Sequence, residues 1–212
     1  MSDTILIAHI LIALLLQVPV AALCQDTEPE EKMARPVAPF VVAGGCPFEC
    51  CGYGKWLIES SARMRANPTV ASPITATIPR STRVTADSGF VRLTRLGRVT
   101  FRAPYRFRTS SQEFSRGDTI LVLDYVGEGA YNAWARGKSM QVEEYWSANP
   151  RDTNSARLLA APRSEWWSHL TWKSGGRERQ GWLYMHGNVK VWGADGCGTP
   201  LPPDTAHVHV SR

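Results

Sequence analysis

The chain has 212 residues, of which 43% are hydrophobic and 20% are charged, and its formal net charge at pH 7 is +5. This composition is typical of a globular protein and excludes a chain that is disordered throughout, while the length suffices for one ordinary core or two small ones. The positive charge favours contact with anionic surfaces, but simple solubility explains it equally well.

The N-terminus, residues 1–24, has the pattern of a secretory signal peptide. The stretch "ILIAHILIALLL" is apolar except for His9, and it is followed by small residues and then by the acids of "QDTEPEE". The run is shorter than the roughly 20 residues of a membrane span. We therefore expect export with cleavage, and an uncleaved N-terminal anchor is the alternative. Residues 25–40 are acidic, contain proline and lack periodicity, which predicts a flexible linker.

The stretch "GGCPFECCGYGKW", from Gly44 to Trp56, holds three of the four cysteines that follow the signal, and Cys197 is the fourth. An exported chain enters an oxidising compartment, where cysteines normally pair. Repeated C-x2-C spacings or nearby histidines are typical of zinc sites, and a C-x2-C motif is typical of redox centres. The stretch "CPFEC" has the different spacing C-x3-C. We therefore predict two disulfides and no metal site.

The pairing of these cysteines is less strongly determined. A bond between the neighbours Cys50 and Cys51 would form a strained ring. A turn helped by the proline in "CPFEC" brings residues four apart within disulfide range, which favours Cys46–Cys50 with Cys51–Cys197. The alternative is Cys46–Cys51 with Cys50–Cys197. In both pairings, one bond joins the start of the fold to a point near its end.

From Trp56 onward, short apolar runs alternate with turn residues. Runs of about four to eight residues, rich in Val, Ile, Thr and aromatic residues, are interrupted by Gly, Pro, Asn or Asp roughly every ten residues, which is typical of an all-β barrel or sandwich. Only "SSARMRANP" and "NSARLLAAP" are compatible with a helical turn or two. Residues 199–212 are predicted to form a C-terminal tail.

The segment "ARMRANPTVASPITATIPRSTRVTA" resembles the opening strands of bacterial SH3-like domains, and "GDTILVLDYVGEGAYNAWARGKS" and "EWWSHLTWKSGGRERQGWLYM" each resemble the later half of such a domain. Together with "CPFECC" and the terminal "DGCG", the span 44–198 resembles a family of exported, uncharacterised bacterial proteins built on this barrel. Two departures are Ser81, at a turn position that is usually Gly, and an insertion from Phe101 to Arg116.

The resemblance implies SH3-like barrels stapled by disulfides, in the periplasm or outside a bacterial cell. We expect two fused small barrels, in the regions 41–105 and 106–198, and one elaborated barrel is the alternative.

No motif in the sequence predicts an enzyme. The chain lacks G-x-S-x-G, H-E-x-x-H and a P-loop, and its candidate nucleophilic cysteines are committed to disulfides. Glu143 and Glu144 point to opposite sides of a strand. His207 and His209 are an isolated pair in the tail. We predict a non-enzyme without a cofactor.

Aromatic residues give the candidate binding site. The neighbours Trp166 and Trp167 must point to opposite faces of a strand, so we expect one of them to face outward. The resemblance implies that Trp167 lines a ligand groove, while Trp182, in the closing Gly-Trp, fills the core. The predicted site residues are Trp167, Trp166, Tyr131, Trp134 and Tyr184, with Arg177 and Arg179 as a basic rim.

These observations predict an exported module that binds a peptide or a cell-wall peptidoglycan ligand through an aromatic groove. The alternative is a structural or assembly component of the cell envelope, with its aromatic residues buried between barrels. Nucleic acid is not an expected partner, and no membrane span is expected in the mature chain unless the N-terminal segment stays uncleaved.

Overall fold

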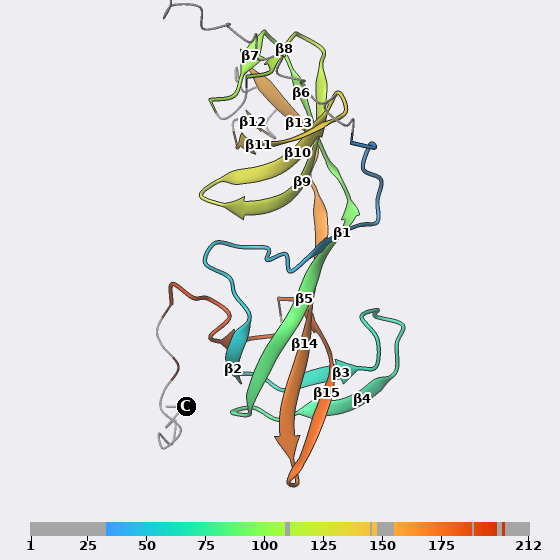
Figure 1. Ribbon diagram of the computed structural model, residues 1–212, viewed down its shortest axis with the longest axis vertical. Helices are drawn as coiled ribbons and strands as arrows, with labels where there is room; N and C mark the ends of the chain where they lie inside the picture. Colours follow the sequence, from blue (N-terminus) through green and yellow to red (C-terminus); the bar gives the residue numbers. More distant parts are fainter. Residues whose placement is uncertain are drawn as a thin grey trace, which may run out of the picture. The chain divides into compact units, whose positions relative to one another are not determined.

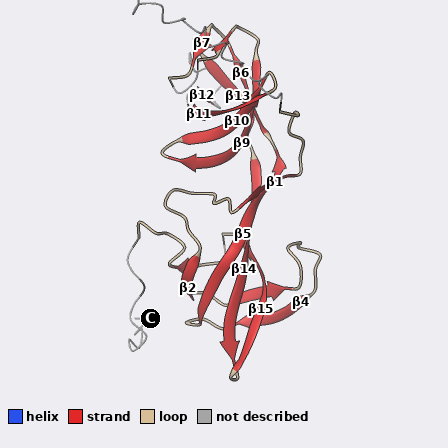
Figure 2. Cartoon of the chain, viewed as in Figure 1, coloured by secondary structure: helices blue, strands red, loops and turns tan. Residues whose placement is uncertain are grey.

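The computed structural model describes residues 33–108, 111–144, 146–147, 155–187, 189–198 and 201. Strands and turns make up these ranges, and they contain no helix, so the predicted all-β fold is confirmed (Figure 2). The predicted signal and the histidine pair of the tail lie outside the described residues. The same ranges contain no helix with the length and hydropathy of a membrane span.

The first sheet has eight strands that come from two distant parts of the sequence (Figure 1). They are β1 (Phe40–Ala43), β2 (Gly54–Ile58), β3 (Ala62–Arg65), β4 (Ile74–Ile78), β5 (Arg83–Arg95), β14 (Arg163–Ser174), β15 (Arg177–Met185) and β16 (Val191–Trp192). Their order is β16-β2-β5-β14-β15-β3-β4, and β1 also pairs with β5. The antiparallel pair of β5 and β14 forms the middle of the sheet.

The second sheet has six strands, all between residues 97 and 160. They are β6 (Gly97–Phe101), β9 (Thr119–Gly127), β10 (Ala130–Ala135), β11 (Lys138–Glu143), β12 (Trp146–Ser147) and β13 (Ala156–Ala160). Their order is β11-β10-β9-β6-β13-β12. A separate pair, β7 (Tyr105–Arg106) with β8 (Glu113–Phe114), lies within the predicted insertion.

Three hairpins end in two-residue turns in which both residues have positive φ. This conformation matches the twist of the flanking strands and favours glycine. The turn residues are Glu128 and Gly129, Arg136 and Gly137, and Gly175 and Gly176. Ser81 also has a positive φ of 64°. The resemblance placed this serine where glycine is usual, and the backbone there does adopt a conformation that glycine prefers.

Each sheet covers its own hydrophobic core. Alternate residues of β14 point inward, so Trp166, Leu170 and Trp172 join the first core together with Trp56 and Met64. The second core is built around three phenylalanines, and it includes Phe101, Phe107, Phe114, Ile120 and Val142. Phe107 and Phe114 belong to the predicted insertion, which therefore completes the core of the second sheet.

The predicted boundary between residues 105 and 106 does not separate the two sheets. Only Leu96 links β5 to β6, and Ala161 and Pro162 alone link β13 to β14. The second sheet is therefore an insertion between two strands that pair with each other in the first. Neither sheet closes into a barrel within the described strands.

Two disulfides are present, as predicted, but the favoured pairing of the cysteines is wrong. Cys46 bonds to Cys51, and Cys50 bonds to Cys197, with Cα–Cα distances of 5.7 Å and 5.4 Å. Two local features explain the difference. Cys50 has a φ of 56°, so the chain does not follow the simple turn on which the favoured pairing depended. The amide of Gly196 also donates to the carbonyl of Cys50 at 2.7 Å, which brings Cys197 beside it.

Candidate functional site

The predicted site residues do not form one groove. Trp167 and Tyr184 lie on the outer face of the first sheet, and Trp166 lies in its core. Tyr131 and Trp134 belong to β10 of the second sheet. The structure therefore brings only some of these residues together.

Trp166 and Trp167 do point to opposite faces, yet both are buried, with 6% and 0% of their surface exposed. The expectation that Trp167 is exposed is therefore wrong. Its ring stacks on Tyr184 at 4.9 Å between centroids, and the guanidinium of Arg92 lies 5.8 Å from its centroid. Its indole N–H donates to Glu165 at 3.2 Å. Neighbouring side chains thus cover the outward-pointing ring.

Trp182 is half-buried and lies outside the first core, so the prediction that it fills the core is wrong. It pairs with His169 across the strands, and its ring contacts Phe90 at 5.6 Å and His169 at 5.2 Å. Since Leu183 is the core residue of this stretch, strand alternation places Trp182 on the outer face.

The predicted basic rim is at the other end of the hairpin. Arg177 directly follows the turn at Gly175 and Gly176, and Arg179 pairs with Trp172. Tyr184 lies five positions after Arg179, which is roughly 17 Å along a strand at about 3.3 Å per residue. The two arginines therefore do not border the stack of Trp167 and Tyr184.

Trp134 holds the segment that precedes the first strand. Its indole N–H donates to the carbonyl of Met33 at 3.3 Å, and the amide of Met33 donates to the carbonyl of Gly137 at 2.8 Å. These bonds attach the described end of the predicted linker to the β10–β11 hairpin. Trp134 thus binds the described end of the linker, and it is not among the residues that line the cavity described next.

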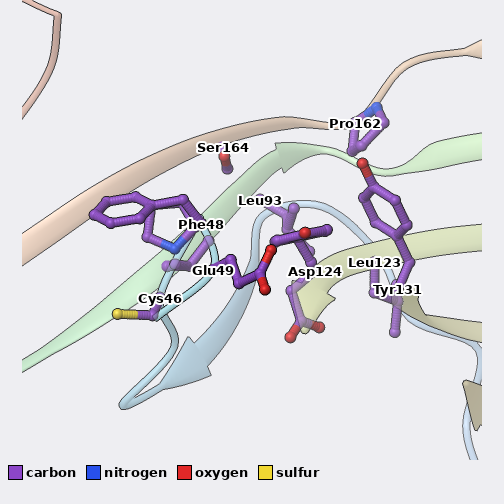
Figure 3. Close-up of a pocket in the computed structure, with 12 residues that line it drawn as sticks. Cys46, Phe48, Glu49, Leu93, Leu123, Asp124, Tyr131, Pro162 and Ser164 are labelled. Atoms are coloured by element: carbon purple, nitrogen blue, oxygen red, sulfur yellow. The ribbon is translucent and has the colours of Figure 1, made fainter. Parts of the chain in front are cut away.

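The structure brings Tyr131 to a cavity of about 430 Å³ where the two sheets meet (Figure 3). Its wall includes the disulfide-bonded loop that contains "CPFEC", and the rest comes from β5, β9, β10, the link before β14 and the start of β14. The lining residues are Cys46, Pro47, Phe48, Glu49, Val91, Leu93, Leu123, Asp124, Tyr125, Tyr131, Pro162 and Ser164. We call this space the junction cavity.

The junction cavity has both apolar and aromatic surfaces. Val91, Leu93 and Leu123 contribute aliphatic side chains that are at most 4% exposed. Tyr125 and Tyr131 contact each other at 5.2 Å in an edge-to-face arrangement. Phe48 packs edge-on against Trp166 at 5.6 Å but is still 41% exposed. The cavity therefore offers an apolar surface with an aromatic residue at its solvent side.

Two carboxylates line the junction cavity and add acidic groups to its apolar surface. Asp124 is 9% exposed and accepts a hydrogen bond from the side-chain amide of Asn132 at 3.0 Å. Glu49 is exposed, and Figure 3 shows it between Phe48 and Asp124. Burial raises the pKa of Tyr131, and the charge of Glu144 adds to this effect, so its phenol stays protonated near neutral pH. The cavity therefore suits a ligand with an apolar part and a cationic group.

The loop that carries Phe48 and Glu49 is held from several sides. Besides the two disulfides, the hydroxyl of Tyr53 donates to the carbonyl of Gly45 at 2.9 Å and accepts from the indole of Trp166 at 3.1 Å. Burial raises the pKa of Tyr53, and the hydrogen bond from Trp166 partly offsets that effect. Sequence reasoning recognised this loop as a covalent staple and missed its place in the cavity wall. The aromatic Phe48 between the cysteines was the available signal.

Cys50, Asp195 and Cys197 place three potential metal-ligand atoms within 4.8 Å of one another. The two sulfurs are bonded to each other, and the carboxylate of Asp195 accepts the amide of Cys197 at 3.0 Å. Metal coordination requires thiolates, which a disulfide does not offer. This group therefore serves to fix the chain.

No protein-family model matches this chain, and neither does any curated protein or any solved structure. The two disulfides are compatible with an extracellular or secreted protein.

Proposed function

We propose that the protein is an exported binding module of the bacterial cell envelope, and that the junction cavity is its ligand site. The ligand is a short peptide that combines an apolar side chain with a cationic one, as the peptide stems of peptidoglycan do when they contain a diamino acid. We also propose that the two sheets are SH3-like, that the protein is periplasmic or secreted, and that it binds its ligand without catalysing a reaction.

The observation that carries the proposal is the composition of the junction cavity. Its volume of about 430 Å³ lies in the range of small-ligand sites. An apolar ligand side chain has Leu93 and Leu123 to pack against, and Phe48 lies where it can cover that side chain. A ligand ammonium group has the carboxylates of Glu49 and Asp124, which favour a charge-assisted hydrogen bond.

Binding is tested with purified cell-wall sacculi and with a fluorescent lysine-containing stem peptide. Phe48→Ala should weaken peptide binding at least tenfold, because the aromatic cover is lost. Glu49→Gln should weaken it about threefold to tenfold and make it less dependent on salt. Glu59→Gln is the matched control, since Glu59 is exposed and does not line the cavity. An absence of saturable binding, or an equal loss in the control, contradicts the proposal.

A structural or assembly role in the envelope is the second candidate, and the burial of Trp166 and Trp167 favours it. In this role the aromatic residues stabilise the fold and bind no small ligand. The same experiment separates the two candidates. A folded Phe48→Ala variant that retains parental affinity for sacculi, with no peptide binding by either protein, supports the structural role.

A further inference from the structure

A second pocket of about 340 Å³ lies on the first sheet, away from the junction cavity, between β3, β15 and the segment after β15. Its polar lining consists of Ser61, Arg63, Arg65, Tyr184 and His186. We call it the basic pocket. None of these residues lines the junction cavity, so an inference about the basic pocket is independent of the function proposed above.

Strand pairing explains why these side chains meet. Trp182 of β15 pairs with Arg65 of β3, and Leu183 pairs with Met64. Continuing this antiparallel register places Tyr184 opposite Arg63. Residues two apart on a strand share a face, so Arg63 joins Arg65, and His186 joins Tyr184. The rings of Tyr184 and His186 are 5.2 Å apart, as this arrangement requires.

Among the described residues, the basic pocket is lined by two guanidinium groups and an imidazole, and by no carboxylate. The two acids on the neighbouring strands of this face have cationic or imidazole partners. Glu165 binds Arg92 at 2.5 Å, and Asp87 contacts His169 at 2.8 Å. The charged side chains that line the basic pocket itself are therefore the two arginines, whereas Glu165 and Asp87 are paired outside its lining.

Two of the donors in the basic pocket are held in place before any ligand arrives. The guanidinium of Arg65 donates to the carbonyl of Ser72 at 2.6 Å. The ring of Tyr184 stacks on the fully buried Trp167. Burial raises the pKa of Tyr184, and the charge of Glu165 adds to this effect, so its phenol remains a hydrogen-bond donor near neutral pH. Held donors lose less entropy on binding a ligand.

We propose that the basic pocket binds a phosphate group of an anionic ligand. Arginine donors form strong charge-assisted bonds with phosphate oxygens, and hydroxyl groups of Ser61 and Tyr184 add further donors. The donors come from two strands. This spread suits the tetrahedrally arranged oxygens of phosphate better than the two coplanar oxygens of a carboxylate. The phosphate is either a terminal group or an internal phosphodiester.

The proposal is tested by calorimetric titration of the intact protein with inorganic pyrophosphate, with backbone amide shifts measured by NMR in parallel. Saturable binding should shift the amides of β3 and the end of β15. Arg63→Gln should weaken binding at least tenfold. Arg177→Gln removes the same charge from an exposed position in the β14–β15 hairpin and should change the affinity less than twofold.

The proposal is overturned by an absence of saturable binding by the parent protein, by an equal loss in both variants, or by malonate binding as tight as pyrophosphate binding. Circular dichroism of each variant verifies that it is folded. Glycerol 3-phosphate and glycerophosphoglycerol then distinguish the two sources of phosphate. Tighter binding of the first indicates a terminal phosphate, and tighter binding of the second indicates a phosphodiester. If neither binds the parent detectably at millimolar concentration, a phosphate site is excluded.

Discussion

The two sheets differ in how their strands are supplied by the chain. The second sheet uses one continuous segment, residues 97–160, and neighbouring strands such as β9, β10 and β11 are joined by short hairpins. The central pair of the first sheet, β5 and β14, has that whole segment between its members. Bringing distant segments together costs more chain entropy than closing a hairpin. The first sheet therefore has the greater need for a covalent connection.

Both disulfides lie at the first sheet, the one that is assembled from distant segments. Cys50–Cys197 spans 147 residues and encloses nearly all of the described chain, and Cys46–Cys51 closes a loop of 5. Cys51 also forms an isolated bridge with Asp195. The first sheet is thus stabilised by one bond that restricts the whole unfolded chain and by another that shapes a local loop.

The largest expected effect comes from removing the long disulfide. In the chain-entropy model, Cys50→Ala with Cys197→Ala lowers the free energy of unfolding by about 5 kcal/mol, and Cys46→Ala with Cys51→Ala lowers it by about 2 kcal/mol. Urea denaturation of both double variants measures the difference. Hydrogen exchange should show a greater loss of amide protection in β5 and β14 than in β9 and β10. Equal losses of unfolding free energy would contradict this account of the two sheets.

An intermediate effect is expected from the outer face of the first sheet. Trp167→Ala should cost about 3–5 kcal/mol, as for other fully buried large aromatic residues. Phe101→Ala, at 1% exposure in the second core, is the matched variant and should cost a similar amount. Trp182→Ala should cost less than about 2 kcal/mol, because this residue is only half-buried.

Thermal and urea denaturation of these three variants provide the measurements. If Trp167→Ala loses less than about 1 kcal/mol while Phe101→Ala loses several, the outer face of the first sheet contributes little stability. Trp167 would then be available for a role in binding, as the resemblance to SH3-like domains implies.

The fold class could be predicted from local patterns, because alternating residues and glycine turns act within a few positions. "GEGA", "ARGK" and "SGGR" give the three hairpins directly, through residues that tolerate positive φ. The insertion of the second sheet between β5 and β14 could not be predicted. It depends on the pairing of β5 with β14, and no local pattern specifies a partner so far away in the sequence. The prediction of the disulfide pairing failed for a related reason. The pairing depends on the φ of Cys50 and on the contact of Cys50 with Gly196.

The candidate site was predictable in its residue types and only partly in its geometry. The sequence pointed to aromatic residues, and Tyr131 does line the junction cavity. Strand alternation correctly separated the faces of Trp166 and Trp167. It did not predict the cover over Trp167, because side chains of three different strands, β5, β14 and β15, provide it. Alternation gives the direction of a side chain, and burial depends on what packs above it.

The smallest expected effect concerns one ion pair in each sheet. In the first sheet, Glu165 accepts from Arg92 at 2.5 Å and 3.0 Å and from the indole of Trp167, and the side chains of Arg92 and Glu165 are 24% and 21% exposed. In the second, Glu143 accepts from Arg108 at 3.1 Å and 3.3 Å, and the Arg108 side chain is 87% exposed. Water and salt screen the second pair far more strongly.

Glu165→Gln should therefore lower the free energy of unfolding by about 1 kcal/mol, since it removes the charge from a partly buried group that has three donors. Glu143→Gln should change it by less than about 0.5 kcal/mol, as is usual for exposed pairs. Urea denaturation at low salt and again in 1 M salt measures both. High salt should abolish the effect of Glu143→Gln and leave most of the effect of Glu165→Gln. The Debye length in 1 M salt is about 3 Å, but a partly buried pair is screened much less than an exposed one. Equal effects at low salt that vanish together in 1 M salt would show that the Arg92–Glu165 pair is screened as an exposed pair is, and that it contributes nothing specific to the cover over Trp167.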